Sequence, residues 1–408
     1  MAKIPQLHDA RHGEGASPAP AASAGSATAL ETLAAQLAAT AVERDRAGGH
    51  AAAERELIRA SGLLRLSIPT AYGGAGASWS TVLAAVRRLA EVDSALAHVF
   101  GFHHLQVAGV MLYGTPEQQA YFLPPTAERQ LFWGNALNPL DRRVIARAEL
   151  DGYRIDGVKN FSSGSVGSDL LTFSAWHKPS GTALIAALPT QADGITVNPD
   201  WDAFGQRQTD SGTVRFDHVR LEAIQVLQAP GVEPSPRATL RSQVAQLIMT
   251  NLYLGIARGA FHEARRYVRD DARPWFASGV SRHADDPYVQ ERFGEFWLRV
   301  QSAQALADQA GLKLDAAIAR GPSVTAAERG EVAVAGAQAK VLAHRAALAV
   351  GSDLFEVTGA SSTAARYGYD RYWRNARVHT LHDPVSYKIR DLGRYALLDQ
   401  APEPTAYS

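Results

Sequence analysis

The chain has 408 residues, 41 basic and 41 acidic side chains with a formal net charge of zero, and no cysteine. The balanced charge argues against a nucleic-acid or anionic-membrane partner, and the lack of cysteine excludes disulfides, thiolate catalysis and cysteine metal ligands. No apolar run approaches the roughly 20 residues of a membrane span. We therefore expect a cytoplasmic protein that acts on small molecules, without nucleic-acid or membrane partners.

The N-terminal part of the chain is predicted to be helical after a tail. Residues 1–27 are rich in Ala, Gly, Pro and Ser and lack the apolar centre of a secretion signal, so we expect a disordered tail. Thr28 and Glu31 have the spacing of a capping box, which predicts the first helix start. Alanine-rich amphipathic segments follow, so residues 28–130 are predicted to form an N-terminal helical domain.

The rest of the chain changes from β to α periodicity. Residues 131–232 contain short segments of period two separated by Gly and Asp-Gly turns, which predict a middle β-barrel or sandwich domain. Three long helical stretches follow, and a further helix is expected from Pro384. Such helices form a four-helix bundle, here residues 238–396, before a C-terminal tail at 397–408. The predicted fold class is α+β.

Two polar loops of the β-domain could hold a ligand. "KNFSSGSVGSD" (159–169) offers backbone N–H groups and hydroxyls, and "WDAFGQRQTDSG" (201–212) offers a tryptophan that could stack on a flat ring beside several hydrogen-bond donors. Each loop alone could equally be a hairpin turn with a supporting Trp. Together they favour a shared ligand. The candidate residues are Asn135 at the mouth of the sheet, Trp201, Arg207, Gln208, Thr209 and Ser211.

Two other patterns have plainer interpretations. The glycine cluster "PTAYGGAGAS" (69–78) matches neither phosphate-loop pattern, so a tight turn is expected. His103, His104, His379 and His382 could form a histidine cluster, although adjacent helical residues point about 100° apart and cannot both serve one site. No HExxH pattern and no carboxylate at ligand spacing accompanies them, so no metal site is expected.

The pair Asp383-Pro384 is typical of a helix N-terminus, with Asp383 as the cap. His382 would then lie just before the helix, where the positive end of the dipole stabilises a negative charge, a suitable place for a donor that faces an anion. Capping would engage the Asp383 carboxylate and leave it poorly free to act as a base. The alternative, that His379 and His382 are buried and merely hydrogen-bonded, stays open.

The α–β–four-helix order and four segments carry a family resemblance over about residues 30–395. "RNARVHTLHDPVSYK", "NFSSGSVGSDLL", "DWDAFGQRQTDSG" and "DPYVQERFGEF" resemble the dibenzothiophene monooxygenase branch of the acyl-CoA dehydrogenase superfamily. The resemblance implies a two-component flavin monooxygenase that receives reduced FMN from a separate NAD(P)H:flavin reductase and uses O2. It implies a flavin C4a-hydroperoxide, oxygenation of an organosulfur compound such as a thioether to a sulfoxide or sulfone, and a homotetramer.

The resemblance also implies roles for particular residues. The catalytic group would comprise His382, Ser163, His103 and His379. The cofactor-binding group would comprise Asn135, Phe161, Ser162, Ser163, Trp201, Arg207, Thr209, Ser211 and Arg282.

Two alternatives on the same fold remain. An acyl-CoA dehydrogenase using FAD needs a carboxylate base, and the positions where one is expected fall at Asp383 and near Ala245, neither of which suits a base. A non-catalytic flavin-binding or scaffold protein would not need the polar loops. The element that receives oxygen, whether sulfur, carbon or nitrogen, stays open, and the choice of FMN over FAD rests on the resemblance.

Overall fold

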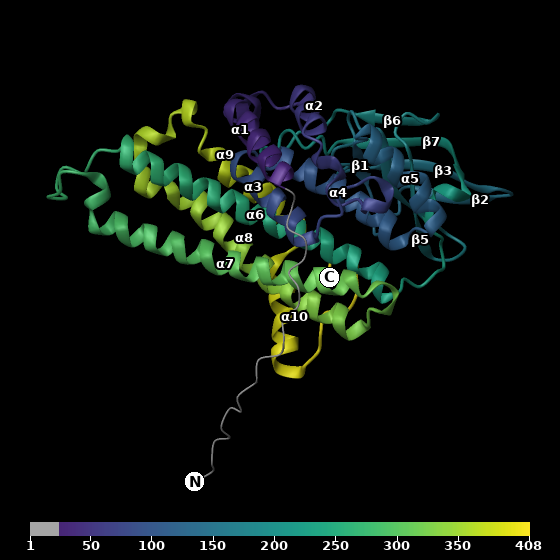
Figure 1. Cartoon of the computed structure of the whole chain (residues 1–408). Helices are drawn as coiled ribbons and strands as arrows, with labels where there is room; N and C mark the ends of the chain where they lie inside the picture. The colour runs from purple at the N-terminus through teal and green to yellow at the C-terminus, as the bar shows by residue number, and fades with distance from the viewer. Residues whose placement is uncertain (1–23) are drawn as a thin grey trace, which may run out of the picture.

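The computed structural model describes residues 24–408, in which helices form both ends of the chain and the strands between them in sequence form a sheet on one side of the molecule, at the right in Figure 1. The N-terminal helices are α1 (Ala24–Ala47), α2 (Ala52–Ala60), α3 (Trp79–Val92), α4 (Ser94–Tyr113) and α5 (Pro116–Arg129). Helix α1 begins at Ala24, so the prediction of a disordered tail is wrong for residues 24–27. The rest of that predicted tail, residues 1–23, lies outside the described residues.

Helix α4 runs through the interior, in contact with α3, α6 and β1. By length and composition it could cross a membrane, which the sequence analysis did not anticipate, but 94% of its most apolar window is buried in the fold. A helix that is apolar all round is typical of a protein core. Asp93 caps its N-terminus by accepting a hydrogen bond of 3.0 Å from the Leu96 N–H.

The β-domain is one curled eight-stranded sheet. Its order is β6-β7-β3-β2-β4-β5-β8, with β1 paired in parallel to β4. The strands are β1 (Trp133–Ala136), β2 (Ile145–Glu149), β3 (Gly152–Lys159), β4 (Leu170–His177), β5 (Thr182–Pro189), β6 (Ile195–Asn198), β7 (Thr213–Glu222) and β8 (Val226–Gln228). The two polar loops connect β3 to β4 and β6 to β7, and they lie against each other, since the Gly164 N–H donates to the Thr209 carbonyl at 2.8 Å.

The C-terminal bundle shares its hydrophobic core with the N-terminal helices. Its helices are α6 (Pro236–Asp270), α7 (Pro287–Ala319), α8 (Ala326–Thr358), α9 (Asp370–Thr380) and α10 (Val385–Leu398). The long helices α6, α7 and α8 run side by side in Figure 1, and α3 and α4 pack on α6 to form one continuous core. The sequence predicted one final helix from Pro384, whereas the structure has two, α9 and α10, separated by the turn 381–384.

The glycine cluster at 69–78 makes a tight turn. A Cβ on Gly74 would lie 2.0 Å from the backbone oxygen of Ile68, so only glycine allows this close approach. The predicted structural interpretation is confirmed.

Candidate active site

Two buried histidines face each other where α4 contacts α9. His98 Nδ1 lies 2.5 Å from His379 Nε2, and the His98 ring stacks on Phe102 with 4.0 Å between centroids. Burial, with the nearby charge of His382, lowers the pKa of His98 to about 3, and burial likewise holds the pKa of His379 well below its ordinary value. Both rings are therefore neutral near pH 7, and one proton lies between them. Among residues 24–408, no group hydrogen-bonds to His98 Nε2.

One helical turn earlier, a second pair of side chains joins the same two helices. Ser94 Oγ accepts hydrogen bonds from Asn375 Nδ2 (3.0 Å) and from Gln206 Nε2 (3.2 Å). Asn375 Oδ1 in turn accepts a 2.6 Å hydrogen bond from the Gln206 backbone N–H. Because residues four apart share a helix face, these contacts align His98 with His379 and attach the β6–β7 loop to them.

A row of buried hydroxyls links the two polar loops. Ser163 Oγ lies 2.8 Å from Ser211 Oγ, which lies 2.7 Å from Thr209 Oγ1. Thr209 ends the row by donating to the Gln206 carbonyl at 3.0 Å. Asn135 on β1 fixes the other end, since its N–H donates to the Ser163 carbonyl at 2.9 Å. Hydroxyls both donate and accept, so such a row can pass a proton or orient one.

An ionic clamp from the N-terminal helices holds these loops in shape. Asp210 Oδ2 lies 2.7 Å from His50 Nδ1 and 3.2 Å from Arg55 Nη1, and Arg55 also donates to the Gly164 carbonyl at 2.9 Å. Phe161, Gln206 and Asp210 have positive φ angles of 57°, 53° and 48°. Non-glycine residues adopt this conformation at a cost of about 1 to 3 kcal/mol each and cluster at functional sites.

An aromatic pair lies on the surface of the loops. Phe161 is 69% exposed, and its ring meets Trp201 edge to face with 5.9 Å between centroids. Trp201 Nε1 donates to the Gln206 carbonyl at 2.8 Å, which fixes the indole. An exposed apolar ring on a rigid polar loop is suited to a flat ligand.

His382 lies in the turn between α9 and α10, with 40% of its side chain exposed. Its Nδ1 is 3.2 Å from Asp383 Oδ1, an oxygen that also accepts a hydrogen bond from the buried Lys340 Nζ. Helix α10 starts at Val385 without a side-chain cap. The prediction that Asp383 caps this helix is therefore wrong, because the buried ammonium of Lys340 takes the carboxylate instead.

Known proteins match this chain over most of its length. Family models described as acyl-CoA dehydrogenase, N-terminal domain, and acyl-CoA dehydrogenase, C-terminal domain, match residues 22–130 and 247–387. A probable FMNH2-dependent monooxygenase, SfnC of Pseudomonas putida, is 50% identical over 92% of this chain and 95% of that protein. Dibenzothiophene monooxygenase of Rhodococcus qingshengii is 45% identical over 91% and 93%. The chain belongs to the dibenzothiophene monooxygenase-like branch of the acyl-CoA dehydrogenase superfamily.

Solved structures of this branch have the same fold. Methanesulfinate monooxygenase MsuC from Pseudomonas fluorescens superposes with a TM-score of 0.92 at 49% identity, covering 93% of this chain and 99% of that one. TdsC from Paenibacillus sp. A11-2, in a complex with FMN and indole, gives a TM-score of 0.90 at 42% identity, covering 94% and 100%.

The loop residues of this dibenzothiophene monooxygenase-like chain fit a flavin. Among residues 24–408, no group hydrogen-bonds to the buried Ser162 Oγ and Gln206 Oε1, so both remain for a polar ring edge. They lie in the same loops as the exposed Phe161 and its partner Trp201. An apolar platform next to unused polar groups matches a ring system that is flat, apolar on its faces and polar on its edge.

Three of the predicted residues lie elsewhere. His103 donates from Nε2 to the Leu64 carbonyl (2.7 Å) and accepts from the Trp133 N–H (3.3 Å), so it supports β1 and does not join the histidine pair. Arg207 lies against Gly48, in the α1–α2 connection. Arg282 is exposed on the α6–α7 connection, where it pairs with Asp285 at 2.9 Å. The structure brings most of the other predicted groups together in the two loops, on β1 and on α9, whereas the His382 side chain lies in the turn after α9 against Asp383 and Tyr407.

Sequence reasoning missed His98, Asn375, Gln206 and Lys340. Within "SALAHVFGFHH" the motif drew attention to the paired histidines, although His98 is the residue one turn after Ser94. Asn375 had a usable signal, since it precedes His379 by four residues on one helix face. Lys340 had none, because a lysine in an alanine-rich helix is ordinarily exposed.

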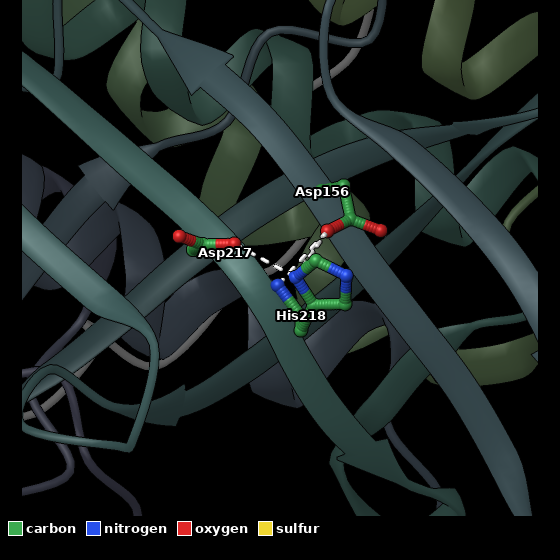
Figure 2. A group of neighbouring side chains, drawn as sticks. All are labelled: Asp156, Asp217 and His218. Carbon is green, nitrogen blue, oxygen red and sulfur yellow. Dashed lines mark hydrogen bonds and ion pairs between the residues drawn. The ribbon is translucent and has the colours of Figure 1, made fainter.

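A second cluster of ionisable groups lies on the sheet and is separate from the His98–His379 pair. Figure 2 shows Asp156 on β3 beside Asp217 and His218 on β7. His218 has a φ of 54°, its N–H donates to Asp156 Oδ1 at 2.9 Å, and its ring Nδ1 lies 2.7 Å from Asp217 Oδ1. The β3–β7 register shifts next to Asp156, so these contacts stabilise a β-bulge.

Proposed function

We propose that this chain is a two-component monooxygenase that uses reduced FMN and O2 to oxygenate a small organosulfur compound. When bound, reduced FMN supplies the electrons that activate O2. The observation that carries the proposal is the neutral, buried pair His98–His379 beside the flavin-compatible loops, in a chain 50% identical to an FMNH2-dependent monooxygenase. Relatives named for dibenzothiophene and methanesulfinate support sulfur as the atom oxygenated.

Each group has a separate task. Trp201 and Phe161, on the two loops, pack against the flavin ring, while Asn135, Ser162 and Ser211 form hydrogen bonds with its polar edge. The His98–His379 pair, His382 and the Ser163 hydroxyl donate and take back a proton at the place where oxygen is transferred. Their burial excludes bulk water, which would otherwise divert activated oxygen to hydrogen peroxide.

An acyl-CoA dehydrogenase is disfavoured by the two positions where its base is expected. The Asp383 carboxylate accepts hydrogen bonds from Lys340 and His382. Burial alone would raise the pKa of Asp383, but the His382 hydrogen bond and the Lys340 charge together lower it further than burial raises it, so Asp383 is a weak base. Ala245 carries a methyl group. A carboxylate tied to a buried ammonium cannot readily remove a substrate proton.

The same proposal includes the partners. Reduced FMN would come from a separate NAD(P)H:flavin reductase in the cytoplasm, and the chain would assemble as a homotetramer. Exposed apolar residues on α7 and α10 support assembly, because a monomer in water gains nothing from them. They include Trp297, Leu298, Leu312, Leu397 and Leu398.

The test is a single turnover. Purified protein is mixed anaerobically with photoreduced FMN and then with 18O2 and a panel of thioethers, sulfoxides and sulfinates, including dibenzothiophene and methanesulfinate. Mass spectrometry should detect one 18O atom in a sulfur product. Release of all the oxygen as hydrogen peroxide with every compound would contradict the proposal, as would oxidation of an acyl-CoA by tightly held FAD.

A further inference from the structure

Lys340 is a charged side chain in the core of the bundle. Only 2% of its side chain is exposed, on the face of α8 that packs against α6. Its Nζ donates to Gln246 Oε1 at 2.6 Å and to Asp383 Oδ1. A buried ammonium is unfavourable unless it is paired, and an apolar residue would fill the same space without that cost. The chain therefore keeps a charge here for a reason other than packing.

Asp383 connects this charge to His382. Its side chain is 8% exposed, and its Oδ1 is shared by Lys340 Nζ and His382 Nδ1. Burial alone would raise the pKa of Asp383, but the His382 hydrogen bond and the Lys340 charge lower it below the ordinary value. The carboxylate is thus ionised, and an ionised carboxylate can only accept hydrogen bonds. The proton on the His382–Asp383 contact must then belong to His382 Nδ1.

We propose that Lys340 is a positioning residue which, through Asp383, holds His382 in the Nδ1–H tautomer and leaves its Nε2 free to accept a proton. The His382 backbone N–H donates to the His379 carbonyl at 3.1 Å, so this turn is attached to the His98–His379 pair. This inference rests on the proposed function, since it assigns Lys340 a part in the same reaction. Lys340 itself is separated from the reacting groups by Asp383. The contact also ties the turn between α9 and α10 to α8, so one buried charge fixes both the direction of the ring and the identity of its protonated nitrogen.

The neighbouring Lys388 provides a matched control. It is also buried and cationic, and its charge also acts on Asp383, but its Nζ donates to the Tyr407 carbonyl instead of the carboxylate. Lys388→Met therefore removes a nearby buried charge without removing the hydrogen bond to Asp383. An effect of Lys340→Met that Lys388→Met does not share therefore comes from the contacts of Lys340 with Asp383 and Gln246, and not from the loss of a nearby buried charge.

The experiment has two readouts on the full-length protein. The first is the ratio of oxygenated sulfur product to hydrogen peroxide, which should fall about tenfold in Lys340→Met and stay at the wild-type value in Lys388→Met. The second needs no flavin: the ring-nitrogen chemical shifts of 15N-labelled histidine, with His382→Gln identifying the signal. Wild type should show the Nδ1–H tautomer at His382, and Lys340→Met should show a mixture.

Loss of stability is controlled by a second variant. In Lys340→Met, Asp383→Asn both charges are replaced by neutral groups, which leaves no unpaired buried ion. This variant should fold but still release hydrogen peroxide in place of oxygenated product. The amide at position 383 can either donate to or accept from the His382 imidazole, so it does not fix which ring nitrogen carries the proton. Wild-type coupling in either variant, or unchanged His382 nitrogen shifts in Lys340→Met, would overturn the inference. If wild type itself oxygenates no sulfur compound, the proposed function fails, whereas the nitrogen shifts still decide the role of Lys340.

Discussion

A pair of imidazoles that share one proton is a different reagent from two separate histidines. His98 and His379 are both neutral because burial penalises their charged forms, so the pair does not retain an added proton and passes on the one that the two rings share. The Tyr253 hydroxyl supports the His379 side by donating to the His379 carbonyl at 3.0 Å. The pair can therefore transfer a proton in a site from which water is excluded.

His98→Gln should lower the yield of oxygenated product per reduced FMN, here called coupling, whereas His103→Gln should not. The first change removes a ring that meets His379, so product per reduced FMN should fall by about tenfold or more, with hydrogen peroxide in its place. The second keeps an N–H donor for Leu64 and should mainly lower the melting temperature. Peroxide and product are measured in parallel after single turnovers. Equal coupling in the two variants would contradict the assignment of His98.

Acid should destabilise the protein through its buried histidines. Burial lowers the pKa of His103 to about 4 and of His98 to about 3, both below the value of 6.5 for an unfolded chain. Between pH 6.5 and 4 the unfolded chain binds protons that the folded protein does not. The free energy of unfolding should therefore decrease as pH falls, by about 1.4 kcal/mol per pH unit for each histidine. Urea unfolding at several pH values measures the slope, which should be shallower in His103→Gln.

The choice between His98 and His103 illustrates what the sequence could not decide. Five residues along a helix rotate the side chain by roughly 140°, so only one of the two can face α9. In an amphipathic helix, the apolar stripe would have indicated which histidine faces the core. Helix α4 is buried on every face and has no polar stripe, so its sequence gives no such indication. By contrast, the serine and tryptophan loops could be found from the sequence, because their turn composition sets them apart from the strands.

At the scale of elements, the site depends on the β6–β7 loop being attached to two helices. Gln206 and Asn375 make that attachment, and a Cβ on Gly205 would lie 2.3 Å from the Arg374 carbonyl, so the loop approaches α9 directly. The sequence predicted both the loop and the helical bundle, but not α9 as a separate helix. The Asp-Pro pair correctly predicted a helix start after residue 383, but α9 before it was missed. That the Asp383 carboxylate binds Lys340 instead of capping the helix is seen only in the tertiary contact.

Asn375→Ala should weaken flavin binding more than it weakens the fold. It removes the acceptor of the Gln206 N–H and a donor to Ser94, which leaves the loop free to move. We expect a rise of about tenfold in the dissociation constant for FMN, corresponding to roughly 1.4 kcal/mol. Quenching of FMN fluorescence measures it. Asn198→Ala, which removes a hydrogen bond to Thr213 at the start of β7, is the control and should leave affinity unchanged.

At the scale of the whole molecule, α7 carries exposed apolar residues two heptads apart, Leu298 and Leu312, which share a face. Leu298→Lys with Leu312→Lys should shift the proposed homotetramer to smaller species by placing charges in an apolar interface. Sedimentation velocity measures the distribution. Leu150→Lys, on the exposed β2–β3 turn, should have no effect. A wild-type protein that sediments as a monomer would refute assembly through this face.

The core shared by the N-terminal helices and the bundle means that these two parts of the chain cannot melt in turn. Residues from Leu33 in α1 to Ala376 in α9 belong to one apolar cluster, so detaching the first helices would expose the surface of α6 that they cover. Calorimetry should therefore record them as one cooperative transition, and a protease that cuts the α1–α2 connection should leave both fragments associated.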